Sequence, residues 1–300
     1  ALVVTAAGTH RAGRLGERLH LQEGPIDLVV DALGPAAARR AAFARADAAF
    51  AGVLAGLARH LPVLRRPLDG DWPGDASATA GRMRRAVARF GDRFVTPMAA
   101  VAGAVADTVL AAIRAVDDLD AAYVNNRGDI ALFVTPARPL DIGVVTALRH
   151  ADIGAGLHVD AASAIGGVAT SGWDGRSFSL GIADAVTVLA RDAATADVAA
   201  TLIANAVDAD DPAVTRTPAA DLDPDSDLGA LPVTTAVGAL SAGAVDDALA
   251  AGRAQAERWV REGRILAALI AVQGRGVVCG HLAHAIRTAD HRSALAEARP

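Results

Sequence analysis

Lysine is absent from this sequence of 300 residues, so arginine supplies every strongly basic side chain. A Schiff-base lysine and the lysine of a phosphate-binding P-loop are therefore excluded. Aromatic residues make up only 3% of the chain, whereas hydrophobic residues make up 52%. The core must therefore consist mainly of alanine and branched aliphatic side chains, with helices that pack closely.

Cysteine is also scarce. Cys279 is the only one, which excludes an internal disulfide framework and is typical of a reducing compartment. A net charge of −5 without a concentrated basic face argues against a nucleic-acid partner. The apolar run at the N-terminus is too short for a signal peptide, and no uncharged run reaches the roughly 20 residues that span a bilayer. We expect a cytoplasmic protein that binds a small molecule, with no membrane partner, and a homodimer is compatible with these features.

The order of apolar patterns predicts an α+β fold. Helices are expected over residues 35–60, 77–90, 98–116, 192–207 and 241–261. Strands are expected over residues 18–22, 26–30, 122–124, 130–134, 142–145, 156–159, 165–170, 183–190 and 233–237, with loops over 65–75 and 208–230. Because helices and strands come in blocks, the sheet should be largely antiparallel. A weak likeness between residues 101–113 and 195–207 suggests two pseudo-repeated halves. We expect one domain over residues 1–275 and a C-terminal extension over 276–300.

The stretch Tyr123–Val134, YVNNRGDIALFV, places a polar bend between two strands. Asn125, Asn126 and Gly128 tolerate positive φ and suit a tight reversal, after which Asp129 would start the second strand. An ordinary hairpin with polar turn residues explains this pattern about as well as a turn that faces a ligand. In the second interpretation, the amides donate and Asp129 accepts hydrogen bonds.

A second candidate is the loop ATSGWDGRSFSLG over residues 169–181. Thr170, Ser171 and Gly172 begin a hydroxyl- and glycine-rich stretch of the kind that binds phosphate through backbone N–H and hydroxyl groups. Arg176 could pair with a phosphate. The alternative is a long surface loop, although Trp173 and Phe178 favour a packed one.

A third candidate is a carboxylate and a hydroxyl, Asp197 and Thr201, which share one face of a predicted helix. Such oxygen ligands suit Mg²⁺. From spacing alone, an aspartate near the helix start that interacts with the helix dipole is the better interpretation.

Two further patterns resemble metal sites less closely. Cys279, His281 and His284, with His291 beyond, could bind zinc, but no second ligand pair with finger-like spacing is present. The acidic run from Asp221 to Asp227 lacks the glycine position and the late glutamate of a calcium loop. A solvated loop explains it better.

Several of these stretches together resemble an uncharacterised bacterial and archaeal family of the ApbE-like superfamily, whose better known members are FAD:protein FMN transferases. The resemblance runs through FVTPMAAVAGAVAD, AYVNNRGDIAL, ATSGWDGRSFSLGIADAVTVLA, ADVAATLIANAV and DLDPDSDLG, and it covers most of residues 15–275. It implies the superfamily's α+β architecture, and a site that binds FAD or FMN with Mg²⁺.

The resemblance also implies roles for individual residues. Asp197 and Thr201 match the residues that bind Mg²⁺ in the transferases, and a backbone carbonyl near Ala100 or Val101 would complete the metal site. The flavin contacts would come from the turn, the serine-glycine pair and the segment before the helix; they comprise Thr96, Met98, Asn125, Asn126, Gly128, Asp129, Thr170, Ser171, Gly172 and Arg176. Two departures stand against flavin transfer. Ala102 occupies the place of the transferases' lysine, and residues 177–181 replace their His-Ile-x-Asp-Pro segment.

Three functions remain open at this stage. The first is a Mg²⁺-assisted protein that binds a flavin or another phosphate-bearing cofactor, with transferase-like chemistry if it is an enzyme. The second is an enzyme for a pterin-type heterocycle in the same cavity, and the third is a binding or scaffold protein whose ancestral site has decayed.

Overall fold

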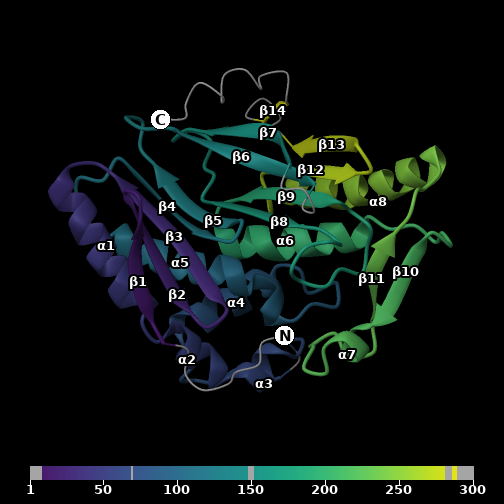
Figure 1. The fold of residues 1–300 in the computed structure, drawn as a ribbon, viewed down its shortest axis with the longest axis horizontal. Coiled ribbons are helices and arrows are strands. Elements are labelled where there is room, and N and C mark those ends of the chain that lie inside the picture. Colours follow the sequence, from purple (N-terminus) through teal and green to yellow (C-terminus); the bar gives the residue numbers. More distant parts are fainter. Residues whose placement is uncertain (1–8, 69, 148–151, 281–285, 289–300) are drawn as a thin grey trace.

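One large antiparallel sheet organises the molecule. The computed structural model describes residues 9–68, 70–147, 152–280 and 286–288. Nine strands pair in the order β1-β2-β3-β4-β5-β8-β9-β12-β13, and each neighbouring pair is antiparallel (Figure 1). These strands are β1 (Arg11–Leu15), β2 (Arg18–Glu23), β3 (Ile26–Leu33), β4 (Ala121–Asn126), β5 (Asp129–Val134), β8 (Gly167–Ser171), β9 (Ala185–Ala190), β12 (Ala267–Val272) and β13 (Arg275–Gly280).

Two smaller sheets and the helices surround this sheet. The strands of the smaller sheets are β6 (Leu140–Ala147), β7 (Asp152–Val159) and β14 (Ile286–Thr288) in one, and β10 (Val214–Pro218) and β11 (Pro232–Val237) in the other. The helices are α1 (Ala36–Phe50), α2 (Val53–Ala58), α3 (Leu61–Leu64), α4 (Ala78–Ala88), the 3₁₀ turn η1 (Pro97–Ala100), α5 (Val101–Ile113), α6 (Ala193–Ala206), α7 (Ala219–Leu222) and α8 (Ala242–Arg261).

The large sheet is covered on both faces. Helices α5 and α6 lie on one face, and β6 and β7 lie over the other (Figure 1). The alternation of side chains along each strand builds two cores. Val124 and Ala131 pack on the helix side, whereas the neighbouring Tyr123 and Leu132 pack under β6 and β7. We refer to these as the helix face and the β6–β7 face of the sheet.

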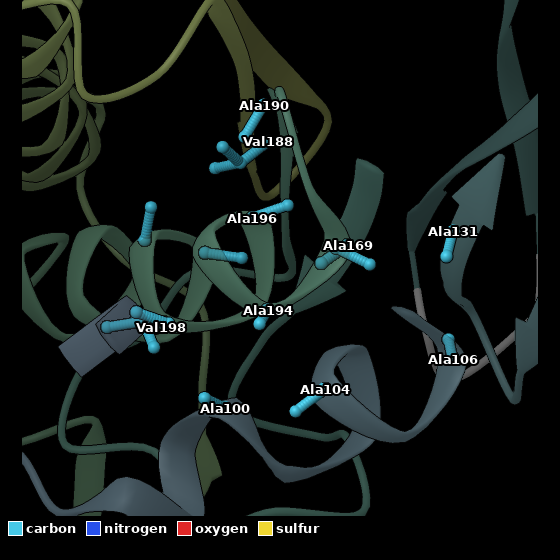
Figure 2. Packing of buried hydrophobic residues seen from close by; sticks show 14 of the residues in the cluster. Ala100, Ala104, Ala106, Ala131, Ala169, Val188, Ala190, Ala194, Ala196 and Val198 are labelled. Atoms are coloured by element: carbon cyan, nitrogen blue, oxygen red, sulfur yellow. The ribbon is translucent and has the colours of Figure 1, made fainter. Parts of the chain in front are cut away.

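Small side chains let α6 lie close to both α5 and the sheet. Figure 2 shows Ala194 and Ala196 of α6 between Ala104 of α5 and Val188 of β9. A Cβ atom added at Gly103 would lie only 2.3 Å from the carbonyl oxygen of Ala193. Glycine is therefore required where α5 meets the start of α6, and the alanines of the two helices allow this close packing.

The two helices also cap each other. Asp107 of α5 accepts hydrogen bonds from the backbone N–H groups of Ala193 and Ala194 at 3.1 and 2.9 Å. Asp197 of α6 accepts one from the N–H of Gly103 at 3.0 Å. N–H groups in the first turn of a helix have no partner within the helix. Each helix thus supplies the carboxylate that satisfies the start of the other.

The predicted fold class and most predicted elements are confirmed. Ser77 and Ser241 cap α4 and α8 by accepting from Ala80 and Ala244. The continuous helix predicted over residues 35–60 is wrong, because Gly52 adopts a φ of +82° and separates α1 from α2. The prediction of a loop over the whole of residues 208–230 is also wrong, because pairing with β11 makes a strand of Val214–Pro218.

In each half of the large sheet, the chain forms a hairpin, then one or more helices, and then a second hairpin. In the first half the hairpins are β2–β3 and β4–β5, and in the second they are β8–β9 and β12–β13. Helix α5 precedes the second hairpin of its half, whereas α6 follows the first hairpin of the other. The two helices with similar sequences, α5 and α6, therefore do not occupy equivalent positions in the two halves. Their sequence likeness is not evidence for a duplication.

Within the part of the chain that the structure describes, one apolar stretch is long and hydrophobic enough for a membrane span. It covers Ala36–Ala58, with a mean hydropathy of 1.4. In the structure it is divided between α1 and α2, and α1 packs against α5. A helix buried in the core of a domain satisfies the same two criteria.

Gly103→Ala should separate α5 from α6 and destabilise the fold by about 3 kcal/mol or more, because backbone atoms of α6 occupy the space of the new methyl group. The matched control is Gly81→Ala in α4, where the nearest atom to an added Cβ is the mobile Arg85 side chain at 3.5 Å. That variant should be unchanged or up to about 1 kcal/mol more stable. Urea denaturation measures both, and equal effects would contradict the close-approach argument.

Asp107 should make stability depend on pH. Burial, opposed by the two N–H bonds, raises the pKa of this carboxyl from 3.8 to about 6. The Asp107 carboxyl therefore binds its proton more tightly in the folded protein than in the unfolded chain. As a result, the free energy of unfolding falls as pH rises from about 4 to 7, and this group contributes roughly 3 kcal/mol to the fall. Asp107→Asn should remove that part of the slope, whereas Asp247→Asn on exposed α8 should retain it. Chemical denaturation across this pH range provides the measurement, and an unchanged slope in Asp107→Asn would refute the assignment.

Candidate functional site

A cavity of about 530 Å³ lies on the helix face at the ends of β4, β5 and β8. Its walls come from the β2–β3 turn, α2, α3, α5, the β4–β5 turn, the loop after β8, and α6. The volume is within the range of pockets that bind small molecules and cofactors. Segments far apart in the sequence thus meet at one candidate site.

One side of this cavity is aliphatic. Helices α2 and α3 present Leu54, Leu57, Leu61 and Leu64 toward it, and α5 adds Val101. Among the described residues that line it, there is no Phe, Tyr or Trp. A flat ring bound here would lie against aliphatic side chains.

The opposite side is acidic. Asp197 and Thr201 of α6 line the cavity together with Asp129, the first residue of β5. Burial raises the pKa of the Asp129 carboxyl well above its usual range, and the charge of Asp197 adds to this effect, while a hydrogen bond from the Thr170 N–H opposes it. The pKa of Asp197 is also raised, mainly by burial, against hydrogen bonds from the N–H groups of Gly103 and Ala102. The two carboxylates therefore disfavour each other's ionisation, and a cation between them would relieve this repulsion.

The polar turn after Tyr123 is divided between the two faces of the sheet. Asn126 points to the helix face, lines the cavity and donates to the carbonyl oxygen of Ala102 at 3.1 Å. Asn125 points to the β6–β7 face, and its side-chain oxygen accepts from the Gly128 N–H at 2.7 Å. Of the two asparagines, only Asn126 lies beside Asp129 in the cavity. Asn125 instead stabilises the turn through its hydrogen bond with Gly128.

Of the residues expected to reverse the chain, Gly128 does so, whereas Asn125 and Asn126 do not. Asn125 and Asn126 complete β4, and positive φ angles occur at Arg127 (+56°) and Gly128 (+116°). Arg127 lines the cavity as well, a position that the sequence argument did not identify. Its unusual place in a tight turn was the available signal.

The loop after β8 forms the third polar part of the cavity, through Ser171, Gly172 and Arg176. An added Cβ at Gly172 would lie 2.5 Å from the carbonyl oxygen of Asp184, so glycine is needed for this packing. Trp173 donates to the Asp184 carboxylate through its indole N–H at 3.3 Å, which anchors the loop to the body of the protein.

The remaining candidate residues are divided: Met98 and Thr170 line the cavity, whereas Thr96 and Ala100 do not. The Thr170 hydroxyl points to the β6–β7 face, where it bonds to the Thr187 hydroxyl at 2.8 Å, although the Thr170 backbone reaches Asp129. Thr96 is buried and donates to the carboxylate of Asp227 in the acidic loop. Ala100 is buried and does not line the cavity, whereas Met98 does.

A smaller depression of about 220 Å³ lies on the β6–β7 face and contains Asn125 and Gly128. These two candidates therefore share a surface with Thr187 and not with Asp197.

No group of three or more His, Cys, Asp or Glu side chains converges as a metal site in the part of the chain that the structure describes. Cys279 is buried in β13, and burial raises the pKa of its thiol to about 11. His281, His284 and His291 lie outside the described residues. The predicted end of the domain at residue 275 coincides with the start of β13, which continues in the same sheet to Gly280.

Comparison with known proteins identifies relatives of the whole chain and of its parts. The UPF0280 protein MK0206 of Methanopyrus kandleri is 39% identical over 137 residues, which cover 46% of this chain and 52% of that protein. A UPF0280 protein of Methanothrix thermoacetophila is 41% identical over 117 residues, 39% of this chain and 48% of that protein. The chain thus spans about half the length of these curated relatives.

The solved structures that are similar to this chain include two ApbE proteins. The apo form of the flavinyl transferase ApbE of Pseudomonas stutzeri shares 14% identity with a TM-score of 0.42, over 98% of this chain and 99% of that chain. The ApbE protein of Thermotoga maritima shares 14% identity with a TM-score of 0.44, over 90% of this chain and 97% of that chain. Both TM-scores lie below 0.5, a level at which a common fold does not follow. The model of the family described as AbpE bacteria, by contrast, matches residues 8–279, and the chain therefore belongs to that family.

Proposed function

We propose that this protein binds a flavin nucleotide, FMN or FAD, together with a divalent cation in the cavity on the helix face, as part of a flavin-transferase-like activity. The single observation that carries the proposal is the convergence of Asp129, Asp197 and Thr201 on one cavity with an aliphatic wall. Membership of the AbpE bacteria family and the motif resemblance around Asp197 support the choice of flavin.

The donor atoms at the acidic side fit Mg²⁺. Carboxylate and hydroxyl oxygens are ligands that this cation prefers, and Thr201 lies one helical turn after Asp197. Because the described residues contain no complete set of protein ligands, a bound cation would take its remaining ligands from water and from a phosphate of the nucleotide. When bound, Mg²⁺ would supply charge neutralisation at a phosphoryl oxygen.

The chain's own residues divide the remaining work. Asn126 is oriented by its bond to the Ala102 carbonyl and presents its amide to the polar edge of a ring. The wall formed by Leu54, Leu57 and Leu61 would exclude water from one side of the ring. Ser171 and the loop that follows would contact the phosphate end.

Retention of the acidic pair argues against a decayed site. An ionised carboxylate that is buried without a cationic partner destabilises the folded protein. Two such carboxylates that face the same cavity destabilise it more. A chain that had lost its ligand would be stabilised by replacing Asp129 with an apolar residue, because Asp129 takes no part in the reciprocal capping of α5 and α6.

Removal of the Asp197 charge should weaken cation-assisted flavin binding. In wild-type protein, Mg²⁺ should increase the thermal stabilisation produced by FMN or FAD. Asp197→Asn retains an oxygen for the Gly103 N–H but should weaken the Mg²⁺-dependent part of the affinity about tenfold or more, and Thr201→Val should weaken it less. The matched control is Asp247→Asn, an exposed carboxylate of α8 outside the cavity, which should bind as wild type does.

Differential scanning fluorimetry and isothermal titration calorimetry, with and without Mg²⁺, measure these effects. If Mg²⁺ changes the flavin affinity equally in wild type and Asp197→Asn, the proposed cation site at Asp197 is wrong. A response to a reduced pterin without any response to flavins would overturn the proposed ligand in favour of the pterin alternative.

A further inference from the structure

The smaller depression on the β6–β7 face is a second candidate binding site. It lies between β6 and the part of the large sheet formed by β5, β8 and β9, across the sheet from the cavity on the helix face (Figure 1). Its volume of about 220 Å³ is less than half the 530 Å³ of that cavity, and it is below the usual range of pockets for drug-sized ligands. A ligand of this depression must therefore be much smaller than a flavin nucleotide.

Two threonine hydroxyls in the smaller depression have a hydrogen atom to spare. Thr170 of β8 and Thr187 of β9 are paired in the strand register, and their hydroxyl oxygens lie 2.8 Å apart. Each hydroxyl carries one hydrogen, and the bond between them uses only one of the two. Neither hydroxyl forms another hydrogen bond within the part of the chain that the structure describes. One O–H group is therefore available to donate to a ligand.

Asn125 supplies a second donor from the β4–β5 turn. Its side-chain oxygen accepts from the Gly128 N–H at 2.7 Å, which fixes the orientation of the amide. The NH₂ group of the same amide has no hydrogen-bond partner among the described residues. Because Asn125 lines the smaller depression together with the two threonines, an amide and a hydroxyl donor are available at one small site.

The rest of the smaller depression is largely apolar and contains no acidic side chain. Its aliphatic part comprises Ile130, Ile142, Val144 and Val168. Arg127 is the one ionisable residue among the described residues that line it. Its guanidinium contacts Asp27 at 3.1 Å, and this acid offsets part of the charge. The neutral donors must therefore provide most of the recognition, beside an aliphatic surface and without a lining carboxylate that would repel an anion.

We propose that the smaller depression binds a short aliphatic carboxylate. A carboxylate has two acceptor oxygens and no donor, which complements the Asn125 amide and the spare threonine hydroxyl. Hydrogen bonds to an ionised acceptor are also stronger than those to a neutral one. A short branched chain on the carboxylate would cover the aliphatic part of the depression. The proposal goes beyond flavin binding and does not depend on it, because Asn125 and Thr187 do not line the cavity on the helix face.

The two sites are nevertheless connected through the sheet. Thr170 lines both of them: its hydroxyl points to the β6–β7 face, and its backbone N–H bonds to the Asp129 carboxyl. Asn125 and Asn126 are also consecutive residues that point to opposite faces. A carboxylate in the smaller depression would therefore contact the same strand ends that carry Asn126 and Asp129.

NMR titration of the full chain with sodium isobutyrate tests the proposal. Wild-type protein labelled with ¹⁵N should show saturable changes in the backbone amide signals of Gly128, Thr170 and Thr187, because these residues line the depression. Isobutyramide has a similar shape without the charge, and it should bind about tenfold or more weakly. Equal affinities for the two compounds would overturn the assignment of the site to a carboxylate.

Asn125→Asp separates ligand binding from support of the turn. The variant retains an oxygen that accepts from the Gly128 N–H, but it replaces the NH₂ donor with a negative charge. Isobutyrate affinity should therefore fall about tenfold or more, with little change in melting temperature. The matched control is Gln22→Glu, which adds the same charge to the same face of the sheet outside the depression and should bind isobutyrate as wild type does.

Thr187→Val removes a buried hydroxyl with almost no change of shape, so it should weaken isobutyrate binding about threefold or more. Thr215→Val, at an exposed position of β10 outside the depression, should leave the affinity unchanged. Three results would each overturn the proposal: no saturable response in wild type, a response confined to amides elsewhere in the chain, or an Asn125→Asp variant that binds isobutyrate as tightly as wild type.

Discussion

The contact between α5 and α6 at Gly103 is the constraint on which the candidate site depends. Without a Cβ atom at Gly103, the N-terminal turn of α6 lies against α5, and each helix receives a carboxylate from the other. Asp197 is one of these carboxylates, so the residue that faces the cavity also satisfies the start of α5. Between the two helices the contact leaves room for small side chains, and Ala104, Ala194 and Ala196 are buried there.

Local patterns in the sequence were sufficient for the α+β class, for the antiparallel sheet and for most element positions. They failed where distant pairing decides the structure. Pairing with β11 made β10 a strand within an acidic, proline-containing stretch. The central strand β12 was missed because its unbroken apolar run carries no alternation that distinguishes a strand buried on both faces from a helix. Gly52 ended α1 through a positive φ that helix propensity alone does not reveal.

The candidate site was predictable in part for a similar reason. The family resemblance predicted that Asn126, Asp129, Ser171 and Asp197 belong to one site. In the structure, all four line the same cavity. Which of two adjacent asparagines faces that cavity depends on strand register, since a strand turns successive side chains to opposite faces. The leucines of α2 and α3 had no local pattern that distinguished a cavity wall from ordinary core.

Ligand binding and helix packing are linked in this arrangement. Asp197 already accepts a hydrogen bond from Gly103, so a cation bound at the same carboxylate acts on a group that also holds α5 against α6. Burial and the nearby Asp107 raise the pKa of Asp197 and make its ionised form costly in the absence of a cation. A cation that favours the ionised form strengthens the acceptor for the Gly103 N–H, because hydrogen bonds to a charged oxygen are stronger than those to a neutral one. Occupancy of the cavity should therefore stabilise the helix pair on which its shape depends.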